Sequence, residues 1–420
     1  MITINADWIE AGDETARPRV FIEAVKEAVI RHESYRRKYK RLYAYYLGQH
    51  KIAGRQRAKA LPNTRLAHGF PAYIVNMAAG YLVGNPITYQ ANGQEAALLE
   101  VLDQMREANV DSVDSELATH ASIYGLGVEI LYANEYAQPR MAAASPMDTF
   151  VVYDDTVEHR PLFAVRRFAG GTEVFTDSYR FRFAGGRLGL DRVIGQEPHF
   201  FGGVPVVEYW NNAEERGDFE GVMDLIDAYN AVQSDRVNDK QQFTDAILIT
   251  RGISEIAANP GDERTAAQRI NDEKLLMFPD KEADASFLTK QLSQGDTEIL
   301  KDALKADIHK FAMVPDLTDE QFSGNSSGVA MKFKLLGLEQ MTKIKERWFR
   351  EALKTRLKLI AHFMEIRGAM PLNAAKVRIT FTHALPKNEL ETAQMIGQLK
   401  GLVPEEVLLS QLSFYDGNEN

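Results

Sequence analysis

The feature that most constrains this chain is an acidic face on one predicted helix. Residues 218–249 contain no proline and repeat apolar residues with a helical period, and they include seven acidic residues against two basic residues. At about 100° per residue, six of the acids fall within one stripe of about 120°: Glu220, Asp224, Asp227, Asp235, Asp239 and Asp245. Exposed helix faces commonly interleave lysine with glutamate in stabilising pairs, and this face barely does. The stripe is therefore predicted to face water, a cationic surface or a surface that it repels.

Charge is separated along the rest of the chain as well. Residues 296–328 contain seven acidic residues against three lysines, whereas residues 332–367 contain ten basic residues against four acids. The formal net charge of the whole chain is −10. A protein that coats DNA is expected to be basic, so this balance does not favour a general DNA-coating role.

Length and composition limit the class of protein. A chain of 420 residues exceeds the size at which one hydrophobic core stops growing, so two or more packed modules are expected. The absence of cysteine excludes disulfides, thiolate metal sites and cysteine nucleophiles. Residues 70–84 form the longest weakly polar run, which is too short to span a bilayer. The first ten residues lack the basic and apolar start of a signal peptide, so synthesis in the cytoplasm is expected.

The order of predicted elements gives an α+β fold. Glycine pairs punctuate a run of short β-branched and aromatic segments between residues 125 and 210, which predicts an antiparallel β region. Helices are predicted on both sides of it. They cover residues 19–50, 72–81, 94–122, 218–249 and 296–313, a long helix ending near residue 367, and a final helical segment. Residues 250–291 are predicted to be mixed α/β, residues 315–328 a polar loop, and residues 377–382 a strand.

No enzyme signature is convincing. The chain has no P-loop, its nine histidines are scattered, and no metal or cofactor site is visible. Residues 324–328 (GNSSG) match the nucleophile elbow G-x-S-x-G, but the polar residues before them cannot form the buried strand that this motif needs. Two alternatives stay open: a serine hydrolase that uses Ser326, and a non-ring DNA-binding protein that uses the basic cluster at residues 36–41.

Several stretches resemble one family, the portal proteins of long-tailed double-stranded-DNA bacteriophages. Their joint order along nearly the whole chain is more specific than any one of them. The stretches are 73–76 (YIVN), 80–87 (GYLVGNPI), 124–125 (YG), 128–132 (VEILY), 150–155 (FVVYDD), 207–212 (VEYWNN), 225–230 (LIDAYN), 315–322 (PDLTDEQF) and 324–330 (GNSSGVA).

The resemblance implies a portal-protein fold assembled as a ring, with paired stem helices, a long wing helix, a β-rich wing and a small α/β clip. The implied parts are a wing (1–217), a stem helix (218–250), a clip (251–291), a second stem helix (292–314), a tunnel loop (315–328), a long wing helix with a strand (329–383) and a short or truncated crown (384–420).

The resemblance also implies a function. The chain would form a ring of about twelve subunits at one capsid vertex, assembled in the host cytoplasm and carried in the virion. Double-stranded DNA would pass through the channel during packaging and ejection. The implied partners are the terminase large subunit, then a head–tail connector protein, and capsid and scaffolding proteins, without a membrane, a cofactor or an enzymatic activity.

The charge pattern agrees with this function, because an acidic lining releases no counterions from DNA and lets the duplex slide. The six acids of the stripe are therefore predicted to line the DNA path. The predicted tunnel-loop residues are Asp316, Asp319, Glu320, Gly324, Asn325, Ser326, Ser327 and Gly328.

Overall fold

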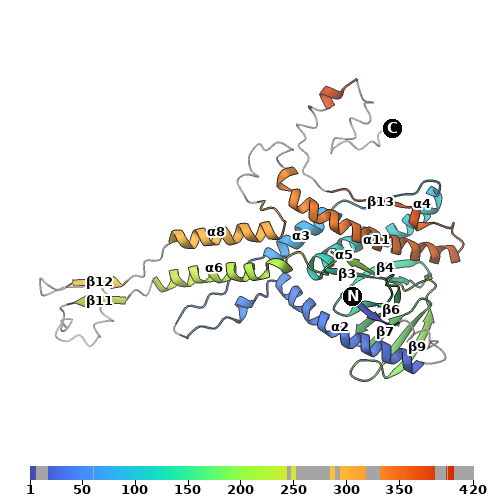
Figure 1. The fold of residues 1–420 in the computed structure, drawn as a ribbon, viewed down its shortest axis with the longest axis horizontal. Helices are drawn as coiled ribbons and strands as arrows, with labels where there is room; N and C mark the ends of the chain where they lie inside the picture. Colours follow the sequence, from blue (N-terminus) through green and yellow to red (C-terminus); the bar gives the residue numbers. More distant parts are fainter. Residues whose placement is uncertain are drawn as a thin grey trace. The chain divides into compact units, whose positions relative to one another are not determined.

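The computed structural model describes residues 1–5, 18–59, 61–243, 247–251, 284–288, 294–317, 332–383, 394 and 396–401. The chain divides into two compact units (Figure 1). Unit 1 comprises Met1–His50, His68–Ile226 and Ala306–Asn420, and unit 2 comprises Lys51–Ala67 and Asp227–Lys305.

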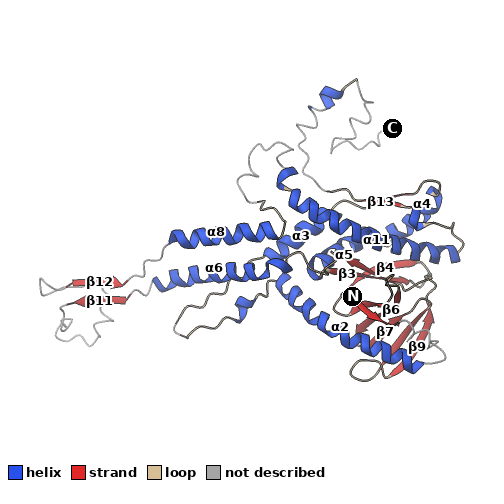
Figure 2. Cartoon of the chain, in the orientation of Figure 1, coloured by secondary structure: helices blue, strands red, loops and turns tan. Residues whose placement is uncertain are grey.

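Helices and strands are largely segregated along the described residues, with eight consecutive strands between α5 and α6, as in an α+β fold (Figure 2). The helices are α2 (Pro18–Tyr46), α3 (Phe70–Val83), α4 (Glu95–Glu107), α5 (Val110–Tyr124), α6 (Met223–Phe243), α8 (Gln294–Phe311) and α11 (Leu336–Ile366). Short 3-10 turns are η1 (Lys51–Gly54), η2 (Glu220–Val222) and η3 (Ala374–Lys376). The strands are β1 (Ile2–Ile4), β2 (Thr88–Gln90), β3 (Leu126–Ala133), β4 (Pro139–Ala144), β5 (Thr149–Asp154), β6 (Pro161–Phe168), β7 (Gly171–Phe175), β8 (Tyr179–Ala184), β9 (Arg192–Pro198), β10 (Val206–Trp210), β11 (Ile247–Arg251), β12 (Asp284–Leu288) and β13 (Arg378–Thr380).

Unit 1 contains three sheets among its described residues. The largest has the strand order β1-β5-β6-β7-β8-β9, the second has the order β10-β3-β4, and β13 pairs with β2. The neighbours from β5 to β9 are antiparallel, as the sequence predicted, whereas β1 pairs with β5 in parallel.

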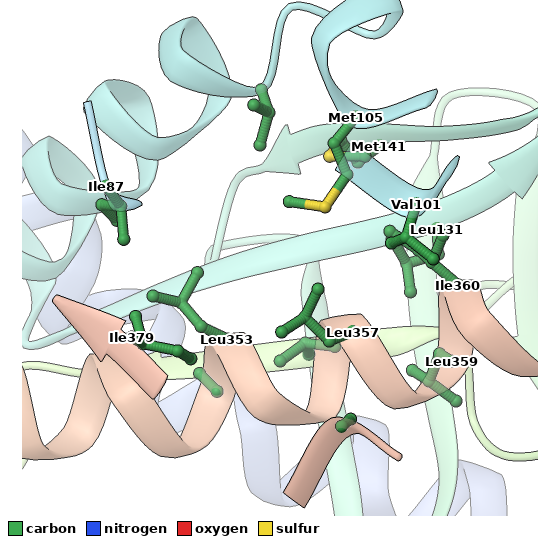
Figure 3. Packing of buried hydrophobic residues seen from close by; sticks show 14 of the residues in the cluster. Ile87, Val101, Met105, Leu131, Met141, Leu353, Leu357, Leu359, Ile360 and Ile379 are labelled. Carbon is green, nitrogen blue, oxygen red and sulfur yellow. The ribbon is translucent and has the colours of Figure 1, made fainter. Parts of the chain in front are cut away.

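Unit 1 is built in layers on the two faces of the large sheet. On one face, Phe21 and Val25 of α2 pack with Phe163 and Phe181 of the sheet. On the other face, residues of β5, β6 and β7 pack against β3 and β10. A third cluster joins α11 to α3, α4, α5 and the strands beside them, and Figure 3 shows Leu353 and Leu357 of α11 within it.

Two cations of α11 are buried and paired. Arg356 is fully buried, and it contacts Asp114 at 2.6 Å and Glu129 at 2.8 Å. Tyr209 donates a hydrogen bond of 2.7 Å to the same Glu129. Lys345 pairs with Asp218, the residue from which the chain enters η2 and α6. These contacts fix α11 against α5, β3 and β10 within unit 1.

The entry into α6 depends on one glycine with a left-handed backbone. Gly125 has φ +87°, and a Cβ there would lie 2.3 Å from the carbonyl oxygen of Glu215, so only glycine fits. Asn211 follows β10, and its Nδ2 donates to the carbonyl of Arg216 at 2.9 Å and to Asp218 Oδ1 at 2.8 Å. Residues 124–125 and 211–218 therefore lie against each other, and their contacts hold the segment that leads into α6.

The structure corrects several predicted elements. The helix predicted over residues 218–249 ends at Phe243, and Ile247–Arg251 is a strand paired with β12, because its β-branched residues favour the extended conformation. The helical region 94–122 is two helices, broken where Asn109 has φ +53°. The strands β1, β2, β4 and β9 were not predicted. None of the described helices is long and apolar enough to cross a bilayer.

A buried carboxyl between the sheets gives unit 1 a pH-dependent stability. Glu208 of β10 accepts hydrogen bonds from the Val151 amide and the Tyr153 hydroxyl, each at 3.0 Å, and burial raises its pKa to about 7 from 4.5. The folded protein therefore binds this proton more tightly than the unfolded chain. Its contribution to stability is present at low pH and is lost as the pH rises through about 7.

Glu208→Gln should remove this dependence. Between pH 4.5 and about pH 8, the free energy of unfolding of the wild type should fall by about 3 kcal/mol relative to the variant, as measured by urea unfolding. Glu135→Gln, at an exposed side chain in the loop after β3, is the control and should follow the wild type. Parallel pH profiles for wild type and Glu208→Gln would contradict the prediction.

Candidate functional site

The acidic stripe of α6 and η2 is the site that the sequence predicted most strongly. Asp224 is exposed, Asp227, Asp235 and Asp239 are half-buried, and Glu220 lies in η2. Asp245 lies outside the described residues. The structure therefore describes five of the six predicted acids, and three of them pair with cations of the same chain.

The first pair lies in unit 1 and uses the basic cluster of α2. Lys38 Nζ contacts Glu220 Oε2 at 3.1 Å and donates to the Glu215 carbonyl at 2.8 Å. Arg36 of the same cluster contacts Asp148 at 3.2 Å. Two cations of the cluster at residues 36–41 are thus engaged within unit 1, which weakens the hypothesis that this cluster binds DNA.

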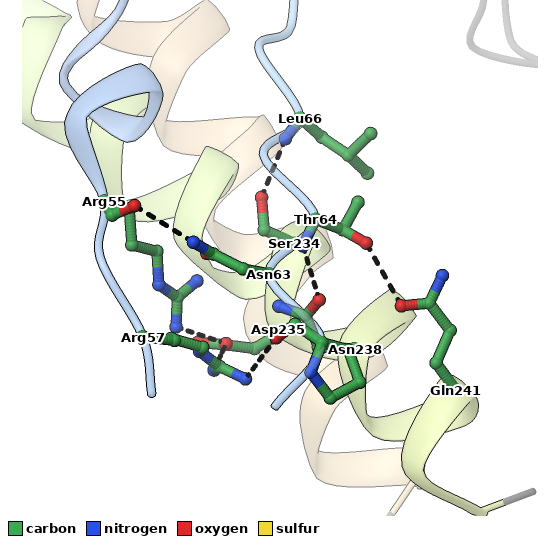
Figure 4. Close-up of polar contacts among 10 residues, drawn as sticks. Arg55, Arg57, Asn63, Thr64, Leu66, Ser234, Asp235, Asn238 and Gln241 are labelled. Atoms are coloured by element: carbon green, nitrogen blue, oxygen red, sulfur yellow. Dashed lines mark hydrogen bonds and ion pairs between the residues drawn. The ribbon is translucent and has the colours of Figure 1, made fainter. Parts of the chain in front are cut away.

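The other pairs lie in unit 2 and involve a segment that we call the basic strap, residues 51–67. It contains five basic residues and no acidic residue. Lys51 contacts Asp227 at 3.0 Å. Arg55 and Arg57 both pair with the same oxygen of Asp235 (Figure 4). The strap therefore brings cations to the acids that the sequence showed without them.

The strap is also held through its backbone. The Leu66 amide donates to Ser234 Oγ at 3.0 Å, and the Thr64 amide donates to Asn238 Oδ1 at 2.7 Å (Figure 4). Ser234 and Asn238 are fully buried. They lie one helical turn apart on α6, so they offer acceptors at the spacing of alternate residues in an extended chain. We call these two side chains the polar ladder.

The strap changes the charge of the surface around α6. The strap and the parts of α6 and α8 that belong to unit 2 contain nine basic residues: Lys51, Arg55, Arg57, Lys59, Arg65, Arg236, Lys240, Lys301 and Lys305. They contain six acidic residues: Asp227, Asp235, Asp239, Asp296, Glu298 and Asp302. The premise of a face with almost no base therefore holds for the helix alone and not for the folded unit.

Helix α8 interleaves its charges. Glu298 pairs with Arg236 of α6 at 3.0 Å and with Lys301 of its own helix, and Lys301 also contacts Asp302 at 3.3 Å. The burial of Ile308 and the exposure of Ile299 (70% exposed) show that α8 has apolar residues on more than one face. An apolar residue so exposed in one subunit is available for contact with another.

The predicted tunnel loop is described only at its start. In unit 1, the Tyr73 hydroxyl donates to the Pro315 carbonyl at 2.7 Å and accepts from the Leu317 amide at 3.3 Å. His309 Nδ1 donates to the Val314 carbonyl at 3.1 Å. Asp316 is half-buried. The other predicted loop residues lie outside the described residues: Asp319, Glu320, Gly324, Asn325, Ser326, Ser327 and Gly328.

Sequence analysis missed the polar ladder and the strap that it holds. The available signal was the recurrence of small polar residues at every fourth position, Asn230, Ser234 and Asn238, all fully buried in the structure. Such a stripe inside a helix predicts a partner that supplies backbone groups, because buried polar atoms need hydrogen bonds. Within the described residues, no cluster of three or more His, Asp or Glu side chains could hold a metal ion.

The comparisons with known proteins agree with one another. The family model described as "Phage portal protein, SPP1 Gp6-like" matches residues 27–420. The portal protein of Bacillus phage SPP1 is 22% identical over 382 residues, which cover 85% of this chain and 74% of that protein. The portal protein of Clostridium phage phiCD119 is 27% identical over 227 residues, which cover 53% of this chain and 48% of that protein.

A solved structure shows a similar fold. A chain from the neck of an empty GTA particle, computed with C6 symmetry, aligns with a TM-score of 0.51 and 13% identity, covering 82% of this chain and 90% of that chain. Portal proteins are structural rather than enzymatic, so the hydrolase hypothesis built on Ser326 is set aside. The chain belongs to the SPP1 Gp6-like family of phage portal proteins.

Proposed function

We propose that the ring formed by this chain is the channel through which duplex DNA enters and leaves the capsid. The observation that carries the proposal is the family match over residues 27–420. In this proposal residues 1–217 and 329–383 form the wing, 218–250 and 292–314 the stem helices, 251–291 the clip, 315–328 the tunnel loop and 384–420 the crown.

The proposed partners follow from that division. The clip would dock the terminase large subunit during packaging and a head–tail connector protein afterwards. The wing would contact capsid and scaffolding proteins. Because the chain has no P-loop, the energy for packaging would come from the terminase partner.

We still propose that the acidic stripe lines the DNA path, but its acidic residues differ in how far their charge is compensated. Glu220, Asp227 and Asp235 pair with cations of the same chain, so their charge is largely compensated. Among the described acids of the stripe, the exposed Asp224 and the half-buried Asp239 are the positions that we propose to test against a passing phosphate backbone. Symmetry would repeat each of them around the ring, which multiplies the field of a single residue.

Ring assembly is the first test. Purified protein should form closed rings of about twelve subunits with a central hole, because a heterologous interface that closes makes a ring. Native mass spectrometry gives the subunit number, and negatively stained images show the hole. A stable monomer or dimer at micromolar concentration would refute the proposal.

The DNA path can be tested by charge reversal. Asp224→Lys/Asp239→Lys adds four positive charges per subunit and should give rings that bind duplex DNA with a steep salt dependence, about 0.9 in log–log slope per phosphate contacted, and that stall packaging. Asp103→Lys/Glu116→Lys makes the same charge change at exposed acids of α4 and α5 and is the matched control. Equal salt slopes for the two variants would place the stripe away from DNA.

The base of the tunnel loop gives a third test. Tyr73→Phe removes both hydrogen bonds of the Tyr73 hydroxyl to Pro315 and Leu317, each worth about 1 kcal/mol. Hydrogen exchange at the amides of Val314, Asp316 and Leu317 should accelerate by up to about thirtyfold, the length of DNA packaged should fall, and rings should still form. Tyr136→Phe, at a side chain that is 71% exposed, is the control. Unchanged exchange and full-length packaging in Tyr73→Phe would exclude this anchoring role.

A further inference from the structure

The pairing of the strap with α6 has an unusual stoichiometry. Two guanidinium groups, of Arg55 and Arg57, share one carboxylate oxygen of Asp235. Both arginine side chains are less exposed (23% and 21%) than that of Asp235 (41%). The arginine side chains are thus directed onto the helix, and the carboxylate is the part of the cluster most open to solvent (Figure 4).

The strap is otherwise a cationic segment that little else neutralises. Lys59 and Arg65 are exposed, and Arg65 Nη1 donates to the strap's own Ala53 carbonyl at 2.8 Å. A free extended segment with five cations would bind phosphates, because each contact releases counterions from DNA. A channel through which a duplex slides cannot contain such a segment unless its charge is compensated.

The strap is attached by polar contacts that water and salt can replace. Among its described side chains only Ile52 is buried. Asn63 Nδ2 donates to the Arg55 carbonyl at 3.1 Å, so the two limbs of the strap are joined to each other as well as to α6. The Nη1 atom of Arg55 is buried without a hydrogen-bond partner among the described residues. The two arginine side chains are part-buried at this carboxylate, so Asp235 both compensates their charge and helps to hold the strap on α6.

We infer that Asp235 masks Arg55 and Arg57, so that the strap's cations are withheld from the duplex. This inference rests on the proposed function, since it takes DNA as the polyanion that the strap would otherwise bind. Asp235 is a positioning residue here: it holds the two guanidinium groups on α6, and the polar ladder holds the backbone of the strap beside it.

The decisive comparison is between two variants that remove the same charge from α6. Asp235→Asn frees two guanidinium groups per subunit, whereas Asp239→Asn frees no cation among the described residues. Asp235→Asn rings should bind a duplex about tenfold more tightly at low salt, with a log–log salt slope steeper by about two for each subunit that contacts DNA. Asp239→Asn rings should show a clearly smaller gain and no comparable steepening.

Reversal distinguishes freed arginines from a general loss of negative charge. Asp235→Asn/Arg55→Gln/Arg57→Gln should return the DNA affinity and the salt slope to wild-type values. Equal gains in Asp235→Asn and Asp239→Asn, or a gain that persists in the triple variant, would overturn the inference.

Two measurements keep the test independent of folding and of the channel. Arg55→Gln/Arg57→Gln in the wild-type background should leave DNA affinity within about twofold, because masked arginines contribute no contacts, and a tenfold loss would overturn the inference.

Hydrogen exchange at the Thr64 and Leu66 amides should accelerate in Asp235→Asn and not in Asp239→Asn. The exchange measurement needs no DNA, so unchanged exchange refutes the masking, whereas wild-type rings that never admit a duplex refute the proposed function alone.

Discussion

One buried guanidinium joins α11 to α5 and β3 inside unit 1. Arg356 of α11 contacts Asp114 of α5 and Glu129 of β3, and Tyr209 of β10 donates to the same Glu129. Burial raises the pKa of the Asp114 carboxyl, and the charge of Arg356 opposes that rise. Removing the guanidinium would leave two buried carboxylates without a counter-charge, which costs about 3–5 kcal/mol. The position of α11 therefore depends on a polar cluster inside an apolar core.

The same helix carries that constraint to the start of α6. Lys345 lies about three helical turns before Arg356, on the same face of α11. It pairs with Asp218 and donates to Ser122 Oγ at 3.0 Å, and the Asp218 amide donates to the Ser122 carbonyl at 2.8 Å. Two of the ten basic residues between positions 332 and 367 are thus buried in ion pairs inside unit 1. They are not available to a neighbouring subunit.

The sequence predicted elements wherever one residue determines the local outcome. The glycine turns of the β region follow from backbone preferences, whereas the helix predicted over residues 19–50 ends at Tyr46, just before Gly48 with φ +80°. Strand β4 was missed because its sequence, PRMAAA, has little β propensity, and β1 because it is short and gains its stability only by pairing with β5. The predicted helix overran its end because Ile247 also fits the apolar side of a helical pattern, and periodicity cannot separate the two over a few residues.

The acidic stripe of the site could be predicted from the sequence, whereas the basic strap that pairs with it could not. The acidic stripe follows from the spacing of residues on a single helix, which is local information. The strap that pairs with it lies some 180 residues earlier, as the Arg55–Asp235 hydrogen bond shows. Nothing in helical periodicity connects a basic extended segment to an acidic helix so far along the chain. The recurrence of Ser234 and Asn238 indicates only that some backbone must be present.

In the proposed channel, the charge of the wall is therefore a property of the folded unit and not of α6 alone. The acids of α6, taken alone, suggest a surface that repels DNA, whereas the strap reverses the balance of the described residues around them. The net charge that this surface presents depends on which cations are paired within the chain. Arg55 and Arg57 pair with Asp235, and Lys51 pairs with Asp227, so these charges are compensated within the subunit. If the proposed channel is correct, a strap with many cations is compatible with a sliding duplex because Arg55 and Arg57 are already paired with Asp235.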